Sequence, residues 1–191
     1  MTDDVLAELR AAILRGDYAP RQRLIEADLA DRYGASRFVL RNALGQLASE
    51  GLVELQPHRG ARVRELSVRE AIEITEIRRA VEAMLAARAA ENMTDAASDE
   101  LAQLGRDMST AVESGDILRY SELNGALHGK VRALADHATG TRIVEQYSAQ
   151  MVRHQFRLAL VPGRPATSLP QHLEIIEALR ARDPQRAEAA M

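Results

Sequence analysis

The stretch that decides the fold is Gly34–Gly51, GASRFVLRNALGQLASEG. Four of its apolar residues recur at the spacing of one helix face: Leu40, Ala43, Leu44 and Leu47. Ser36 is a favourable N-cap, and glycine at position 51 suits the residue that follows a helix. Gly34 allows the positive φ of a tight turn before that helix. We therefore predict an amphipathic helix that begins at Ser36 and ends before Gly51.

The face opposite this stripe carries side chains suited to DNA. Its residues are Arg37, Phe38, Arg41 and Asn42, and residues 32–49 include no acid. Two arginines one turn apart without a counter-charge are typical of a helix that enters a DNA groove. A solvated amphipathic helix would show the same pattern, so the flanking sequence has to decide.

The flanking sequence favours a DNA-binding domain. Helical spacing predicts two short helices at 2–15 and 24–33, the second joined to the opening helix by a tight glycine turn. After Gly51 the pattern alternates, which predicts two strands and a turn over residues 52–64. The turn holds His58, Arg59 and Gly60, which can reach phosphates or a minor groove. Three helices and a basic hairpin predict a winged helix-turn-helix domain at residues 1–66.

The rest of the chain, residues 67–191, has helical spacing almost throughout, which predicts a mainly α protein with an all-α antiparallel bundle as its second domain. The predicted helices are 67–92, 94–113, 117–136, 142–160, a fifth from about 168 to 182, and a short last helix from 183. Breaks are predicted at Thr139–Thr141 and across the proline-containing residues 162–170.

Charge and composition limit the function classes. The net charge is −3, yet residues 36–64 carry five arginines against two glutamates, a local charge of +3. Positive potential is therefore focused on one segment rather than spread over a basic coat. The absence of cysteine excludes disulfides and thiolate metal sites, and no apolar run is long enough to span a membrane. We expect a cytoplasmic protein without a signal peptide.

A possible metal site is indicated by Asn124 and His128, which lie four residues apart and so share one helix face. His172 lies near the start of a later predicted helix. Two imidazoles and an amide oxygen suit Zn, Ni or Mn. The alternative is that His128 is a hydrogen-bonded interior residue. We interpret His137 and His154 as structural residues, and Tyr120 and Tyr147 as packing residues.

Residues 24–63, LIEADLADRYGASRFVLRNALGQLASEGLVELQPHRGARV, resemble the DNA-binding domain of GntR-type bacterial transcriptional regulators. The helical remainder resembles the FCD effector domain of the FadR subgroup. The resemblance implies operator contacts through the start of the recognition helix and the wing tip, which here are Ser36, Arg37, Phe38, Arg41, His58 and Gly60. This chain departs from the usual pattern with Phe38, Val39 and Asn42. Phe38 could contact a thymine methyl or pack on the first helix, and Asn42 could contact adenine.

The resemblance also bears on the effector site. Many FCD domains have an acidic or amide residue four before a histidine, a second histidine on a later helix, and a third on the last helix. Asn124, His128 and His172 match this order, and the third histidine would lie beyond Met191. Arg78 matches an arginine that lines the pocket of similar domains, and Arg157 is a second candidate; each could instead form an ion pair. Arginine holds a carboxylate with a bidentate fork.

These observations predict a homodimeric repressor that binds a palindromic double-stranded operator and is released by a small organic acid, bound directly or through a divalent metal. An activator on the same fold is one alternative. A metal-dependent enzyme using Asn124, His128 and His172 is another, although no general base is evident beside them. Glu174, two residues from His172, should point away on a helix.

Overall fold

The computed structural model describes residues 2–56, 60–159, 161 and 163–191, and the chain divides into two compact units. Unit 1 comprises Met1–Ala71 with Gln146–Arg153, and unit 2 comprises Ile72–Glu145 with His154–Met191. Among the described residues, no helix is long and apolar enough to cross a bilayer.

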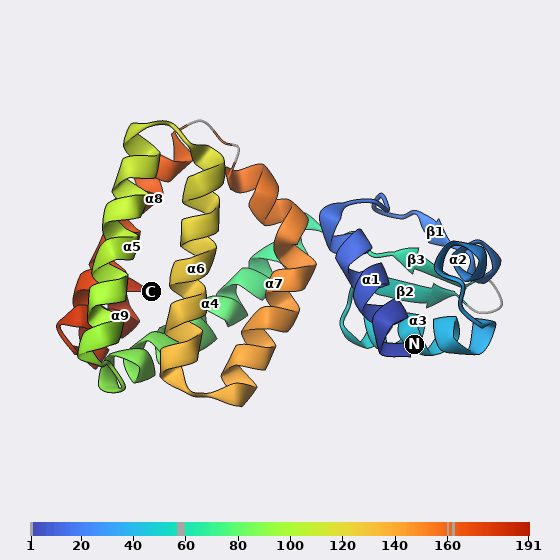
Figure 1. The fold of residues 1–191 in the computed structure, drawn as a ribbon, viewed down its shortest axis with the longest axis horizontal. Helices are drawn as coiled ribbons and strands as arrows, with labels where there is room; N and C mark the ends of the chain where they lie inside the picture. The colour runs from blue at the N-terminus through green and yellow to red at the C-terminus, as the bar shows by residue number, and fades with distance from the viewer. Residues whose placement is uncertain (1, 57–59, 160, 162) are drawn as a thin grey trace. The chain divides into compact units, whose positions relative to one another are not determined.

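Unit 1 is a helix-turn-helix followed by a small sheet (Figure 1). Its elements are α1 Thr2–Arg15, β1 Arg23–Leu24, α2 Glu26–Tyr33, α3 Arg37–Ser49, β2 Val53–Gln56 and β3 Gly60–Val63. α3 packs against α1, α2 and the sheet. Its four stripe residues are all buried: Leu40, Ala43, Leu44 and Leu47. The predicted winged helix-turn-helix is therefore confirmed.

The turn between α2 and α3 has the predicted geometry. Gly34 ends α2 in the left-handed conformation with φ 59°. Ser36 caps α3, because its Oγ accepts a hydrogen bond from the backbone N–H of Val39 at 3.3 Å. These two residues fix where α3 begins and therefore which of its side chains face outward.

The sheet has one strand more than predicted. Leu24 was predicted to open the second helix, but Arg23–Leu24 forms β1 and pairs antiparallel with β3, so the strand order is β1-β3-β2. Leu24 is buried in the core from this strand, and Ile25 remains extended, so α2 begins only at Glu26. A two-residue strand is too short to show an alternating pattern in the sequence.

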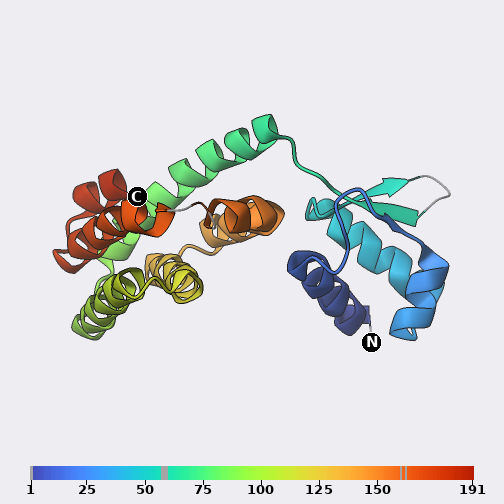
Figure 2. The same cartoon turned by 90° about the horizontal axis from the view of Figure 1, so that it is seen from above.

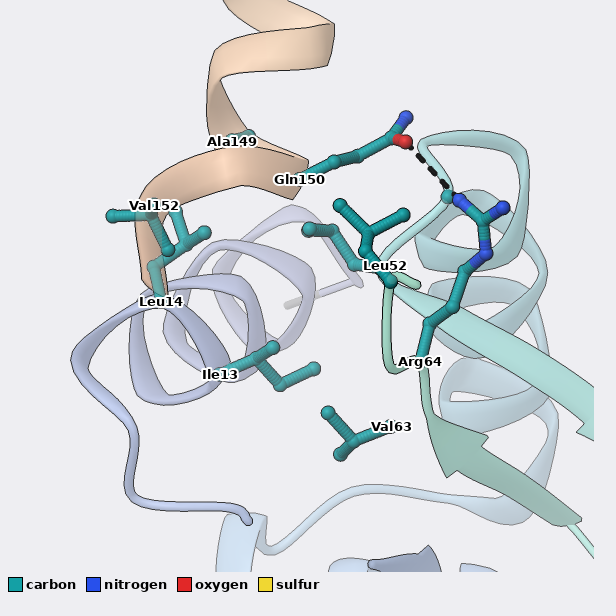
Figure 3. A pocket seen from close by; sticks show the side chains of 10 residues that line it. Ile13, Leu14, Leu52, Val63, Arg64, Ala149, Gln150 and Val152 are labelled. Atoms are coloured by element: carbon teal, nitrogen blue, oxygen red, sulfur yellow. Dashed lines mark hydrogen bonds between the residues drawn. The ribbon is translucent and has the colours of Figure 1, made fainter. Parts of the chain in front are cut away.

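A segment from later in the chain completes unit 1. Residues 146–153 of α7 (Ala138–Ala159) pack beside α1 and β3, around a pocket of about 30 Å³ (Figure 3). Gln150 accepts a hydrogen bond from Arg64 at 3.1 Å and donates one to the carbonyl of Glu50 at 2.8 Å. The pocket has room for about one water molecule, so it is not an effector site.

The described residues of unit 2 form helices joined by short turns, with no strand among them. Besides the rest of α7, it contains most of α4 (Val68–Glu91) and four further helices: α5 Asp95–Glu113, α6 Ile117–Ala135, α8 Arg164–Arg180 and α9 Pro184–Ala190. α5 runs beside α6 in both views and also packs on α8, which in turn packs on α9 (Figures 1 and 2). Buried residues of α4, α5, α6 and α8 share one core, which includes Leu85, Met108, Leu127 and Leu179.

Two of the predicted helix boundaries in unit 2 are wrong. α7 starts at Ala138 and runs through Thr139–Thr141, because the chain turns earlier, at Asp136, which has φ 45°. His137 then accepts a hydrogen bond at Nδ1 from the backbone N–H of Gly140 at 3.0 Å. α8 starts at Arg164 and contains Pro170, although residues 162–170 were predicted to be a loop. Pro165 lies in the first turn of α8, where proline loses no helical hydrogen bond.

We predict that Gly60→Ala destabilises unit 1. Gly60 has φ 79°, and an added Cβ would lie 2.4 Å from the carbonyl oxygen of Leu24 in β1. Strain and overlap should lower the free energy of unfolding by about 1–3 kcal/mol, measured by urea denaturation. Gly45→Ala within α3 is the control, because its added Cβ meets nothing within 4 Å. Equal stability of Gly60→Ala and the wild-type protein would contradict the prediction.

Candidate functional site

The predicted DNA-binding surface of unit 1 borders a hollow of about 930 Å³ between α2, α3 and the wing. We call it the reading hollow, and its lining residues come from the first turn of α2, one face of α3 and the facing strands. They include Arg23, Ile25, Glu26, Arg37, Arg41 and Leu55. Among the described residues, three arginines and one carboxylate line it. Sequence reasoning missed Arg23 and Glu26, because both lie outside the predicted recognition helix.

The residues predicted to contact DNA from α3 are all exposed: Ser36, Arg37, Phe38, Arg41 and Asn42. Phe38 is 72% exposed, so the alternative that it packs on the first helix is wrong. An aromatic ring held in solvent at the start of a recognition helix is available for contact with a base. Arg37 forms no ion pair with any described residue.

Arg41 differs from Arg37 because it has a carboxylate partner. Its Nε lies 3.1 and 2.9 Å from the two carboxylate oxygens of Glu26, the first residue of α2. The guanidinium is nevertheless 67% exposed, and Glu26 is 23% exposed. A screened surface pair of this kind contributes little to stability, so its effect is mainly on the position of Arg41.

The wing is described in part. His58 and Arg59 lie outside the described residues, so the predicted contacts at the tip remain predictions. Gly60 is the first residue of β3. A glycine is required there because the backbone of Leu24 lies too close to accommodate a side chain. Arg64, just after β3, forms an ion pair with Glu70 and donates a hydrogen bond to Gln150, so contacts within the protein already engage it.

In unit 2, polar side chains from three helices meet inside the bundle. This polar cluster comprises Arg78 and Glu82 of α4, Tyr120, Asn124 and His128 of α6, and Ser168 and His172 of α8. On each helix its members are four residues apart, so each set lies on one face. Sequence reasoning assigned Tyr120 to packing and overlooked Glu82 and Ser168.

Hydrogen bonds fix the α6 and α8 members. The Oη of Tyr120 lies 2.7 Å from Nδ1 of His172 and 2.8 Å from Oγ of Ser168, which donates to the backbone carbonyl of Arg164 at 3.1 Å. Nε2 of His172 has no hydrogen-bond partner in the described part of the chain. The ring centres of His172 and His128 are 5.9 Å apart, with the two rings perpendicular.

Both histidines are held neutral. Burial lowers the pKa of His172 to about 4, with help from His128 and Arg164. Burial also lowers the pKa of His128, opposed by Glu82, whose carboxylate oxygen is 3.7 Å from its Nδ1. Neutral imidazole is the form that binds a metal ion or accepts a hydrogen bond.

The polar cluster supplies a partial set of metal ligands. Among the described residues, no group of three or more His, Cys, Asp or Glu is placed to hold one. The Oδ1 of Asn124 is buried and has no hydrogen-bond partner among the residues that the structure describes, and an unpaired buried oxygen is costly unless a ligand satisfies it. Asn124, His128 and His172 thus supply one amide oxygen and two neutral imidazoles, a set that fits a borderline divalent ion.

Of the two arginines predicted to bind the effector, one has a described side chain. Arg78 lies in the polar cluster, but its Nη2 is 2.6 Å from Glu82, so an ion pair already engages it. The side chain of Arg157 lies outside those that the structure describes. Glu174 forms an ion pair with Arg186 at 2.7 Å and does not join the polar cluster. In the sequence, the four-residue spacing between Arg78 and Glu82 is the one sign that Glu82 pairs with this arginine.

Comparison with known proteins identifies the family. Residues 1–63 match the bacterial regulatory proteins of the gntR family, and residues 73–191 match the FCD domain. The HTH-type transcriptional repressor RspR of Escherichia coli K12 is 30% identical over 183 residues, covering 96% of this chain and 80% of that protein. A probable D-xylose utilization operon transcriptional repressor of Paenarthrobacter nicotinovorans is 29% identical over 170 residues, covering 87% and 73%. The solved structure of E. coli McbR/YncC superposes with a TM-score of 0.76 at 26% identity, covering 99% and 90%.

A winged helix-turn-helix with an exposed, arginine-bearing recognition helix, joined to an all-helical domain, defines a DNA-binding transcriptional regulator. This chain belongs to the GntR family and carries an FCD domain after its DNA-binding domain. The metal-dependent enzyme considered from the sequence is set aside, because the family and the named relatives are regulators.

The pKa of His172 makes stability depend on pH. In the folded chain this ring stays neutral down to about pH 4, whereas an unfolded histidine protonates near 6.5. Between these values the unfolded chain binds more protons, so acidification lowers the free energy of unfolding. We expect a loss of about 1–2 kcal/mol across this range, because partial exposure of the ring reduces the effect.

Urea denaturation at pH 7 and at pH 5 measures this dependence. His172→Gln removes the titrating group and should reduce the difference in stability between the two pH values. An unchanged difference in His172→Gln would show that other groups cause it.

Proposed function

We propose that this regulator represses transcription by inserting the N-terminal half of α3 into the major groove of an operator. The observation that supports this most directly is the exposed, acid-free start of α3 beside the reading hollow, where Arg37, Phe38 and Arg41 face outward. Arg41 would contact a base edge, Phe38 a thymine methyl and Asn42 an adenine. Arg37 and the wing residues His58 and Arg59 would contact phosphates.

Repression rather than activation is favoured by two relatives whose names describe repressors. Activation from the same fold is the alternative, because the sign depends on where the operator lies relative to the promoter. The FadR subgroup is our finer assignment, and we propose a cytoplasmic location, where a bacterial regulator meets DNA. A homodimer would bind two half-sites of a palindrome about one helical turn apart, because a two-fold protein matches a two-fold site.

The polar cluster of unit 2 is our candidate effector site, and a small organic acid is the effector that its chemistry fits. The acid's carboxylate would compete with Glu82 for Arg78, since both would use the same guanidinium. Such an exchange would release Glu82, which also faces His128 of α6 at 3.7 Å, and would thereby change the contact between α4 and α6 and bias the helical domain toward another arrangement. A ligand that prefers the arrangement unable to bind DNA shifts the population away from the operator.

A divalent metal is the possible cofactor of this site. Asn124, His128 and His172 would hold it, with Tyr120 orienting His172 from behind. When bound, Zn, Ni or Mn would supply a Lewis-acid position for the effector's carboxylate. The buried, unpaired Oδ1 of Asn124 is the observation that supports this.

We predict that Arg41→Ala weakens operator binding by about 1–3 kcal/mol and relaxes base preference, because a side chain that contacts a base edge is lost. Fluorescence anisotropy would measure this on a duplex selected by the wild-type protein from a randomised pool. Arg106→Ala on α5 is the control, because it removes an exposed arginine of unit 2 whose side chain, among the described residues, bonds only to Gln103. Unchanged affinity of Arg41→Ala would refute the assignment of α3 as the recognition helix.

A thermal-melt panel tests the effector site. Sugar acids, hydroxy acids and dicarboxylates are added with Zn, Ni or Mn, or with chelator, and we expect one class to raise the melting temperature only with metal. Asn124→Ala should abolish that shift, whereas Asn42→Ala, an exposed asparagine of unit 1, should preserve it. A shift that survives chelation would argue against the metal and for direct binding at Arg78. A metal-dependent shift that survives Asn124→Ala would place the site elsewhere.

A further inference from the structure

We infer that Glu26 is a positioning residue that controls how Arg41 meets DNA and is thereby a determinant of base specificity. This inference rests on the proposed contact between Arg41 and the operator. It concerns a carboxylate that precedes the recognition helix and that belongs to the supporting helix α2.

The geometry restrains one end of the guanidinium and leaves the other end available. Both carboxylate oxygens of Glu26 approach Nε of Arg41, at 3.1 and 2.9 Å. The two Nη groups form no hydrogen bond with any side chain or backbone atom that the structure describes. They are the groups that form a bidentate contact with the edge of a guanine or with a phosphate. Glu26 therefore aims the unused donors of Arg41 outward.

Among the described residues, Arg41 is the sole hydrogen-bond and ion-pair partner of the Glu26 carboxylate. Its other local role is the general stabilisation that a first-turn carboxylate gives to a helix N-terminus, which Asp28 shares. The N-cap of α2 is Ile25, and no side chain caps this helix end. Glu26 is the less exposed member of the pair, at 23% against 67% for Arg41, so it acts as the fixed support and Arg41 as the projecting group. Both line the reading hollow. The pair is thus part of the surface that would face DNA.

A carboxylate on that surface has an electrostatic cost. It repels phosphates, so it lowers the sequence-independent attraction that arginines provide. Arg23 and Arg37 line the same hollow without an ion pair among the described residues, and they can serve phosphates. Arg41 is different, because swinging toward a phosphate would break its contacts with Glu26. The pair therefore weakens binding to any DNA while favouring a base-directed Arg41.

This balance predicts that the affinity for non-specific DNA and the specificity ratio change in opposite directions. In Glu26→Gln, binding to a shuffled duplex of the same composition should strengthen, because one negative charge is removed. The ratio of selected-duplex to shuffled-duplex affinity should fall about tenfold, within the range of one well-oriented base contact. Glu26→Asp keeps the charge but shortens the reach, so the ratio should fall without stronger binding to the shuffled duplex.

The experiment is anisotropy on both duplexes with the full chain, after circular dichroism shows that each variant is folded. Asp28→Asn is the matched control, because it removes the same charge from the same helix turn and Asp28 does not line the reading hollow. It should leave the ratio unchanged. A ratio in Glu26→Gln equal to that of the control would overturn the inference.

Arg41→Ala separates this inference from the function on which it rests. If Arg41→Ala lowers the ratio and Glu26→Gln does not, Arg41 contacts the operator without help from Glu26, and only the inference fails. If Arg41→Ala also leaves the ratio unchanged, the proposed recognition surface is wrong and the inference falls with it. Loss of binding to both duplexes in folded Glu26→Gln would likewise contradict it, since a general loss of affinity is the opposite of the expected gain on shuffled DNA.

Discussion

Burial of one apolar stripe of α3 is the constraint on which unit 1 depends. Leu40, Leu44 and Leu47 are each at most 1% exposed and pack against α1 and the sheet. Removing one buried leucine of this kind typically costs about 2–5 kcal/mol, so the rotation of α3 is strongly fixed. Because the stripe faces inward, Arg37, Phe38 and Arg41 must face outward. The DNA-binding surface is therefore a consequence of core packing.

Much of unit 1 could be predicted from the sequence because its signals are local. Ser36 and Gly34 mark the turn, and the stripe of α3 has clear helical spacing. The strand at Arg23–Leu24 could not be predicted, because its reason is the pairing with β3 about forty residues later. The contact between Glu26 and Arg41 is hidden for the same reason, since it joins residues of two helices across a turn.

Unit 2 shows where spacing alone is insufficient. The proline-containing residues 162–170 predicted a loop. A helix tolerates Pro165 in its first turn, however, and α8 continues through Pro170. Asn124, His128 and His172 were found from spacing and resemblance, and the structure places them in one polar cluster. Glu82, Tyr120 and Ser168 carry no sequence signal of their own, because their roles arise from helices that meet only in the folded bundle.

The central claim is that the start of α3 contacts operator bases. Photo-crosslinking tests it most directly, using a selected duplex in which individual thymines are replaced by 5-iodouracil, followed by mass spectrometry of the attached peptide. The account predicts crosslinking of a peptide that contains Phe38, at one thymine position in each half-site. Crosslinking only to peptides of unit 2, or to peptides of unit 1 outside residues 34–51 and the wing, would contradict it.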